Sequence, residues 1–230
     1  MPPPLRVSVA GAAVDLLPEG AAFLPEARTL LVADAHFGKA ASFRALGVPV
    51  PSGTTADTLD RLEAALGRVA AARVVFLGDF LHSARGRSAG TLAALAHWRA
   101  RRAGLAMTLV RGNHDAHAGD PPPELGLEVV AEPLPLAPFL LCHHPEPHPG
   151  GYVLAGHLHP AVRLSGPARQ RLTLPCFRFG AAVGVLPAFG SFTGRAVLPA
   201  RPGEHLYALA GEAVVPVQAA PPQPRRRLRA

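Results

Sequence analysis

The sequence predicts an α/β fold built on two sheets. Five short apolar runs end directly in polar residues, as buried parallel strands do at their carboxyl ends. Two stretches with apolar residues three or four positions apart alternate with the early runs and predict helices. From residue 162 to 217 this helical spacing disappears, and short apolar runs alternate with Gly and Pro. That pattern is typical of a further sheet.

The first 51 residues predict a β-hairpin over 5–17, centred on Gly11, followed by short strands at 22–24 and 29–33. Segment 38–51 contains two prolines near its end, which stop a long helix, so we expect a loop with one helical turn.

The two predicted helices cover residues 54–71 and 91–102. Thr54 or Thr55 is a suitable cap for the first, and Trp98 lies on the apolar side of the second. A strand, a helix and a strand in short succession indicate parallel strands with right-handed crossovers. We expect a surface turn at 121–124. Further strands are expected at 74–77, 108–110, 128–130, 134–136, 139–142, 152–155, 171–174, 182–186 and 212–217.

The length and composition are those of one large domain, which we place at residues 1–218. The remaining residues, 219–230, are rich in Pro and Arg and predict a disordered tail. No apolar run approaches the roughly 20 residues needed to cross a bilayer, and the first residues lack the features of a signal peptide. Cys142 and Cys176 lie in apolar runs and read as buried thiols. We therefore expect a cytoplasmic protein with no membrane partner.

The net charge of +7 permits a nucleic-acid partner but does not require one. Of the 23 basic residues, 22 are arginine and only Lys39 is lysine, which indicates a compositional preference for arginine. Basic surfaces do attract phosphate backbones. The charge is consistent with DNA as a substrate, and the evidence for chemistry comes from elsewhere in the chain.

That evidence is the set of metal-binding groups that follow the five apolar runs. They read Asp-x-His at 34–36, Gly-Asp-x-x-His at 78–82, Gly-Asn-His-Asp at 112–115, His-His at 143–144 and Gly-His-x-His at 156–159. Carboxylates, imidazoles and an amide oxygen together favour Mn, Fe or Zn over Ca or Mg. The ligands are too many for one ion, so we expect two, bridged by Asp79. Two ions about 4 Å apart can bind a phosphate and activate water.

The residues, their order and their strand-end positions resemble the calcineurin-like metallophosphoesterase superfamily. The resemblance implies a four-layer α/β/β/α sandwich with two mixed sheets and a site for two divalent ions. We expect manganese, with iron or zinc as alternatives. The implied ligands are Asp34, His36, Asp79, Asn113, His157, His159 and either His143 or His144. We favour His143, because the family ligand is usually the first His after the strand.

The resemblance also implies catalytic roles for three residues. His114 corresponds to the general acid or transition-state stabiliser beside the leaving oxygen, and Asp115 would hydrogen-bond to it and orient it. His82 resembles a His that nuclease members place over the scissile phosphate. Lys39 and Arg44 lie close to ligands in the sequence, and we expect them to contact substrate phosphates.

Four segments narrow the resemblance to the bacterial ligase-associated DNA damage response endonucleases, over roughly residues 5–217. They are Asp34-Ala35-His36-Phe37-Gly38-Lys39-Ala40-Ala41-Ser42-Phe43-Arg44, Pro49-Val50-Pro51, Gly78-Asp79-Phe80-Leu81-His82-Ser83 and Leu186-Pro187-Ala188-Phe189-Gly190-Ser191-Phe192-Thr193-Gly194. The subfamily implies DNA as substrate, and an ATP-dependent DNA ligase and a helicase as partners. Ala35 and Arg195 depart from its usual residues, Leu and Gly.

We therefore expect a metal-dependent phosphodiesterase that acts on DNA as an endonuclease in repair. A phosphodiesterase or phosphatase for cyclic nucleotides or similar small esters is one alternative. The basic charge and the lack of an obvious capping domain argue against it. A non-catalytic, metal-holding partner of the ligase or helicase is another. The complete ligand set and the intact His114 argue against that reading.

Overall fold

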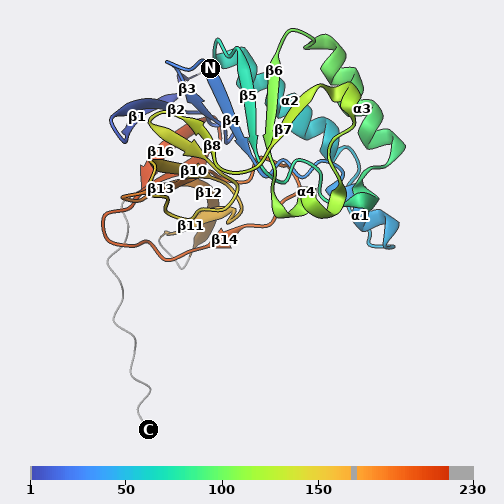
Figure 1. Cartoon of the computed structure of the whole chain (residues 1–230). Helices are drawn as coiled ribbons and strands as arrows, with labels where there is room; N and C mark the ends of the chain where they lie inside the picture. The colour runs from blue at the N-terminus through green and yellow to red at the C-terminus, as the bar shows by residue number, and fades with distance from the viewer. Residues whose placement is uncertain (1, 167–169, 218–230) are drawn as a thin grey trace.

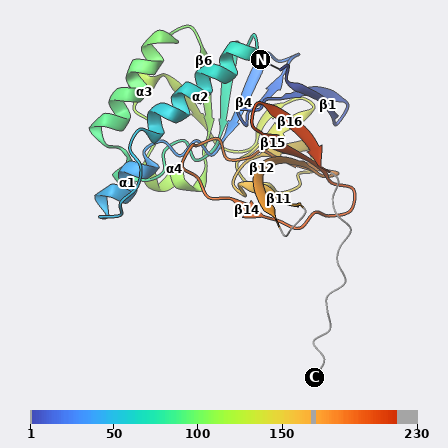
Figure 2. The same cartoon turned by 180° about the vertical axis from the view of Figure 1, so that it is seen from behind.

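The computed structural model describes residues 2–166 and 170–217, and the predicted tail lies outside this range. Two mixed sheets pack face to face, and the helices cover the outer face of the first sheet (Figures 1 and 2). The predicted α/β sandwich with two mixed sheets is confirmed. One feature differs from the expected four layers. Within the described residues, the helices lie on the first sheet, and no helix covers the second (Figures 1 and 2).

The first sheet has seven strands in sequence order, with an antiparallel half and a parallel half. Its strands are β1 Leu5–Val9, β2 Ala12–Leu16, β3 Ala22–Leu24, β4 Thr29–Ala33, β5 Arg73–Leu77, β6 Ala106–Val110 and β7 Leu127–Val130. The predicted hairpin and both short strands that follow it are confirmed. The parallel strands β4, β5 and β6 are followed by the first three groups of metal-binding residues.

The second sheet has nine strands in the order β14-β11-β12-β13-β10-β9-β8, with β15 and β16 added beside β12. Its strands are β8 Leu134–Leu136, β9 Phe139–Leu141, β10 Tyr152–Ala155, β11 Pro160–Ser165, β12 Arg171–Phe179, β13 Val183–Val185, β14 Ala196–Val197, β15 His205–Ala210 and β16 Ala213–Val217. The prediction of a further sheet is confirmed. The three parallel strands β9, β10 and β13 lie side by side.

The helices differ from the predictions mainly at their ends. They are α1 Lys39–Ala45, α2 Thr54–Arg68, η1 Ala84–Gly86, α3 Ala89–Arg101, α4 Asn113–Ala118 and η2 Pro123–Leu125. The expected threonine cap of α2 is wrong, because Gly53 occupies the cap position with a positive φ. Ser88 caps α3 by accepting a hydrogen bond from the Thr91 amide, which starts this helix two residues early. Helix α1 lies in the segment 38–51 that we expected to be a loop with one helical turn, and α4 was not predicted.

Successive side chains of β4 and β5 point to opposite faces of the first sheet, and this divides the core into two parts. Leu30 and Val32 pack under the helices, whereas Leu31 and Ala33 face the second sheet. Trp98 packs with the helix-side group, as predicted. Because both faces of the central strands are buried, their only accessible part is the end of each strand, where the polar residues lie.

Cys142 and Cys176 are buried and free, as predicted. Burial raises the pKa of each thiol to about 11. Within the described residues, no helix combines the length and apolar character needed to cross a membrane.

Candidate metal centre

The registers of the parallel strands bring the predicted site residues together. Ala33 on β4 is opposite Leu77 on β5, which is opposite Val110 on β6. In the second sheet Leu141 on β9 is opposite Leu154 on β10. The residues that follow these strand ends therefore lie side by side within each sheet. Since the sheets pack face to face, the two sets of residues meet at one end of the sandwich.

The backbone is strained at this meeting point. Five predicted ligands have positive φ angles: Asp34, His36, Asp79, His157 and His159. Such conformations cost about 1–3 kcal/mol each in residues other than glycine and concentrate at functional sites. Hydrogen bonds between the segments hold them in place, including His36 N to Asp79 O (2.8 Å) and His157 N to Asp34 Oδ2 (2.8 Å).

Two glycines of the motifs are required because ligand side chains pack directly against them. A Cβ atom on Gly78 would lie 2.1 Å from the His143 ring, and one on Gly156 would lie 2.6 Å from Asp34 Oδ2. Gly78 also has a φ of 77°, which side chains disfavour. The glycines thus allow the ends of the two sheets to approach closely enough for their polar side chains to meet.

The first group consists of Asp34, His36, His159 and one oxygen of Asp79. His159 Nε2 lies 3.3 Å from His36 Nε2 and 3.7 Å from Asp34 Oδ1. His36 Nε2 lies 3.7 Å from Asp79 Oδ2. Asp34 is fully buried, yet its Oδ1 has no hydrogen-bond partner. Because leaving a buried carboxylate oxygen unpaired is costly, a cation among these atoms fits the observed arrangement.

The second group forms around His143, which is fully buried. Its Nε2 lies 2.8 Å from Asn113 Oδ1, 3.0 Å from His157 Nδ1 and 3.5 Å from Asp79 Oδ1. Its Nδ1 hydrogen-bonds to the Leu77 carbonyl at 3.0 Å, which leaves the Nε2 lone pair directed into the group. Asp79 thus presents one oxygen to each group, as expected of a bridging carboxylate.

The state of the imidazoles also suits metal binding. Burial lowers the pKa of His36 strongly, and Lys39 and neighbouring histidines lower it further. Burial is also the main cause of the lowered pKa of His157, with His143 and His144 adding to it. These rings are therefore neutral at pH 7, the form in which a ring nitrogen can coordinate a cation.

The geometry favours His143 over His144 as the ligand. His144 is 40% exposed, and its Nδ1 pairs with Glu132 Oε1 at 2.6 Å. Glu132 Oε2 accepts hydrogen bonds from the backbone amides of His143 (2.7 Å) and His144 (3.0 Å). Burial alone would raise the Glu132 pKa, but these hydrogen bonds lower it below its usual value. Glu132 therefore positions the His-His segment, a role for which the sequence carries no motif.

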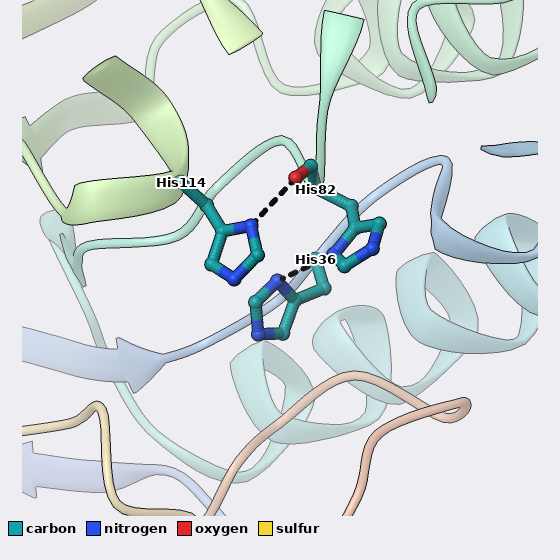
Figure 3. A group of neighbouring side chains, drawn as sticks. All are labelled: His36, His82 and His114. Carbon is teal, nitrogen blue, oxygen red and sulfur yellow. Dashed lines mark hydrogen bonds between the residues drawn. The ribbon is translucent and has the colours of Figure 1, made fainter. Parts of the chain in front are cut away.

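His114 and His82 lie beside the first group, and Figure 3 shows their rings together with that of His36. His114 Nδ1 donates a hydrogen bond to the His82 carbonyl oxygen at 2.7 Å. Its Nε2 therefore remains available and lies 4.0 Å from Asp79 Oδ2. His114 is 38% exposed, whereas His36 and Asp79 are each 3% exposed. A substrate oxygen can thus reach this ring.

The role predicted for Asp115 is wrong in its contact. Asp115 does not hydrogen-bond to the His114 ring; its carboxylate accepts from the amides of Phe80 (2.9 Å), Leu81 (3.3 Å) and Gly112 (2.9 Å). As the third residue of α4 it lies under the helix start, where backbone amides lack partners. It is a positioning residue that joins the end of β5 to the start of α4.

His82 is held between two aromatic neighbours. Its ring stacks on His114 at a centroid distance of 4.8 Å and on Phe43 at 6.1 Å. Its Nδ1 lies 3.4 Å from His36 Nδ1. Burial, followed by the charges of Lys39 and His114, lowers its pKa to about 4. His82 is thus neutral at the edge of the site.

Lys39 and Arg44 occupy different surroundings. Lys39 is partly buried and close enough to Asp79 and Asp34 that their charges oppose the lowering of its pKa by burial. It lines a small pocket with His36. The Arg44 Nη1 instead donates to the Pro51 carbonyl at 2.8 Å and holds the loop between α1 and α2. The structure brings Lys39 to the candidate centre, while Arg44 is engaged in supporting that loop.

Fold and site together define an α/β sandwich with a buried carboxylate–histidine centre where the ends of two sheets meet. No family model matches the chain, and no curated protein does. Among solved structures, the crystal structure of the Pseudomonas putida nuclease MPE is similar, with 42% sequence identity and a TM-score of 0.83. The match covers 93% of this chain and 100% of that one. The chain belongs to the same family as this nuclease, a family of nucleases and phosphoesterases.

Proposed function

We propose that this protein is a metal-dependent phosphodiesterase that holds two divalent ions, with manganese preferred, and cleaves DNA as an endonuclease. The observation that carries this proposal is the placement of Asp79 between two groups of ligand atoms, beside the unpartnered Oδ1 of Asp34. The similarity to a Pseudomonas putida nuclease supports phosphodiester bonds as the target. A role in DNA repair beside a ligase and a helicase rests on the subfamily motifs.

Different residues of the site have different roles in such a reaction. Bound at this centre, the ions would neutralise phosphate charge and lower the pKa of a water molecule. Asp79 and Asp34 supply the negative charge that holds them, and the neutral imidazoles complete the ligand sets. Lys39, close to both carboxylates, places a further positive charge beside the phosphate.

His114 supplies the proton for the leaving oxygen. Its Nδ1–H is committed to the His82 carbonyl, so Nε2 is the nitrogen that faces the site. With Nε2 protonated, the ring donates that proton as the phosphorus–oxygen bond breaks. The His82 ring stacks on His114 and limits its rotation. Asp115 fixes the segments that carry both histidines.

A paired assay tests this function. Protein reconstituted with manganese is expected to hydrolyse bis-p-nitrophenyl phosphate and to nick supercoiled DNA, and chelation by EDTA should abolish both activities. Activity on the small ester alone would indicate a phosphodiesterase for small molecules. If protein with two ions bound hydrolysed neither substrate, the catalytic proposal would be wrong.

A further inference from the structure

We propose that a pocket formed by Arg61 and Arg195 binds a second phosphate group of the nucleic-acid strand, beside the phosphate that is hydrolysed. This inference rests on the proposed function. The pocket has a volume of about 60 Å³, and His159 of the candidate metal centre forms part of its wall. Gly190, Ser191 and Thr193 also line it.

The pocket brings two positively charged side chains together. Both guanidinium groups line it, and neither has a carboxylate within ion-pair distance in residues 2–166 and 170–217. Burial is the main cause of the lowered pKa of Arg61; the charges of Asp57 and Glu19 oppose this lowering, and the charge of Arg195 adds a smaller contribution to it. Like charges that face one small polar cavity repel each other, and an anion between them removes that repulsion.

The two arginines are held by contacts that leave donors for a ligand. Arg61 Nη1 donates to the Phe189 carbonyl at 2.8 Å, and its guanidinium lies 5.8 Å from the centre of the Phe189 ring. Arg195 Nη1 donates to the Thr173 carbonyl at 3.2 Å. A guanidinium has five N–H donors, so most of those on each side chain remain for phosphate oxygens.

The wall of the pocket is tied directly to the candidate metal ligands. The amides of Phe189 and Gly190 donate to the carbonyls of Ala33 (2.8 Å) and Asp34 (3.2 Å). The amide of Ala196, next to Arg195, donates to the His159 carbonyl at 2.9 Å. The pocket therefore has a fixed position beside the first ligand group.

This arrangement selects between substrates. A nucleic-acid strand carries a phosphate at each nucleotide, so one phosphate can lie at the metal centre while a neighbour enters the pocket. Bis-p-nitrophenyl phosphate has one phosphate and cannot occupy both places. The pocket therefore predicts preference for a strand over a small diester.

A binding measurement tests the pocket without turnover. The probe is a fluorescently labelled single-stranded DNA oligonucleotide in EDTA, followed by anisotropy across a salt series. Arg195→Ala is expected to raise Kd about tenfold, which is the effect of one charge-assisted hydrogen bond. The negative slope of the log association constant against log salt concentration should become shallower by about 0.7. Arg195 is exposed, so this variant should fold, and melting temperature checks it. Arg61→Gln should act in the same direction.

The matched control is Arg101→Gln, because Arg101 is an exposed arginine at the C-terminal end of α3. Its Kd is expected to stay within about twofold of the wild type. Equal Kd values for Arg195→Ala and wild type would contradict the proposed phosphate-binding role of the pocket. The absence of salt-dependent binding by the wild type would contradict it as well. In manganese, Arg195→Ala should also lower the ratio of DNA to small-ester kcat/KM about tenfold. If the wild type bound the oligonucleotide in an Arg195-dependent way but did not hydrolyse DNA, the proposed function would be wrong. The phosphate-binding role of the pocket would still stand.

Discussion

Asp79→Asn is expected to reduce hydrolysis of both DNA and bis-p-nitrophenyl phosphate by about 10³-fold or more, because charge stabilisation of several kcal/mol is lost. Asp79 is almost completely buried, and its two oxygens face the two ligand groups. An amide has no net charge and presents an NH₂ in place of one oxygen, so one group loses its acceptor. The variant should fold, since the amide oxygen can still accept from the His114 amide.

Metal content and melting temperature distinguish the loss of a metal ligand from unfolding of the variant. Elemental analysis of Asp79→Asn should find fewer than two manganese ions per chain, with a melting temperature near that of the wild type in EDTA. Asp60→Asn, at an exposed position of α2, is the control and should behave as wild type. Two bound ions and full activity in Asp79→Asn would contradict the bridging role.

His114→Ala is expected to keep both ions and to lose about 10²–10⁴-fold in kcat on DNA, the usual contribution of a general acid. The ring lies beside the ligand atoms and is more exposed than they are, so its removal leaves the ligands in place. The loss should be smaller on bis-p-nitrophenyl phosphate, because p-nitrophenolate leaves readily without a proton. Steady-state kinetics on both substrates, with metal content measured in parallel, checks this.

His97→Ala is the matched control, since His97 is exposed on α3. Full activity of His114→Ala on DNA would show that another group protonates the leaving oxygen. An equal loss on both substrates would instead indicate that His114 stabilises the transition state without transferring a proton.

The sequence could indicate which candidate ligands lie close together, because these residues directly follow strands. A buried strand that ends in Asp or His can be recognised from a few adjacent residues, and parallel pairing then brings such ends together without further information. Asp34, Asp79 and Asn113 illustrate this, since each follows a paired strand of the first sheet. Within the described residues, the two mixed sheets follow the resemblance, and the helices lie on the first sheet.

Contacts between distant segments were harder to predict. The spacing of Asp115 and His114 is compatible with a hydrogen bond between their side chains, yet the start of α4 turns the carboxylate toward backbone amides. Glu132 reaches the His-His segment only because β8 pairs with β9. Arg61 and Arg195 are far apart in the chain, and only the packing of the loop after β13 against α2 joins them.

The most direct test of the central claim is a crystal structure with manganese and an anomalous difference map. We expect two peaks that share Asp79. One should lie among Asp34, His36 and His159, and the other among Asn113, His143 and His157. A single peak, or a second ion bound by His144 in place of His143, would contradict the ligand assignment. The absence of any peak in protein that is active with manganese would contradict the account as a whole.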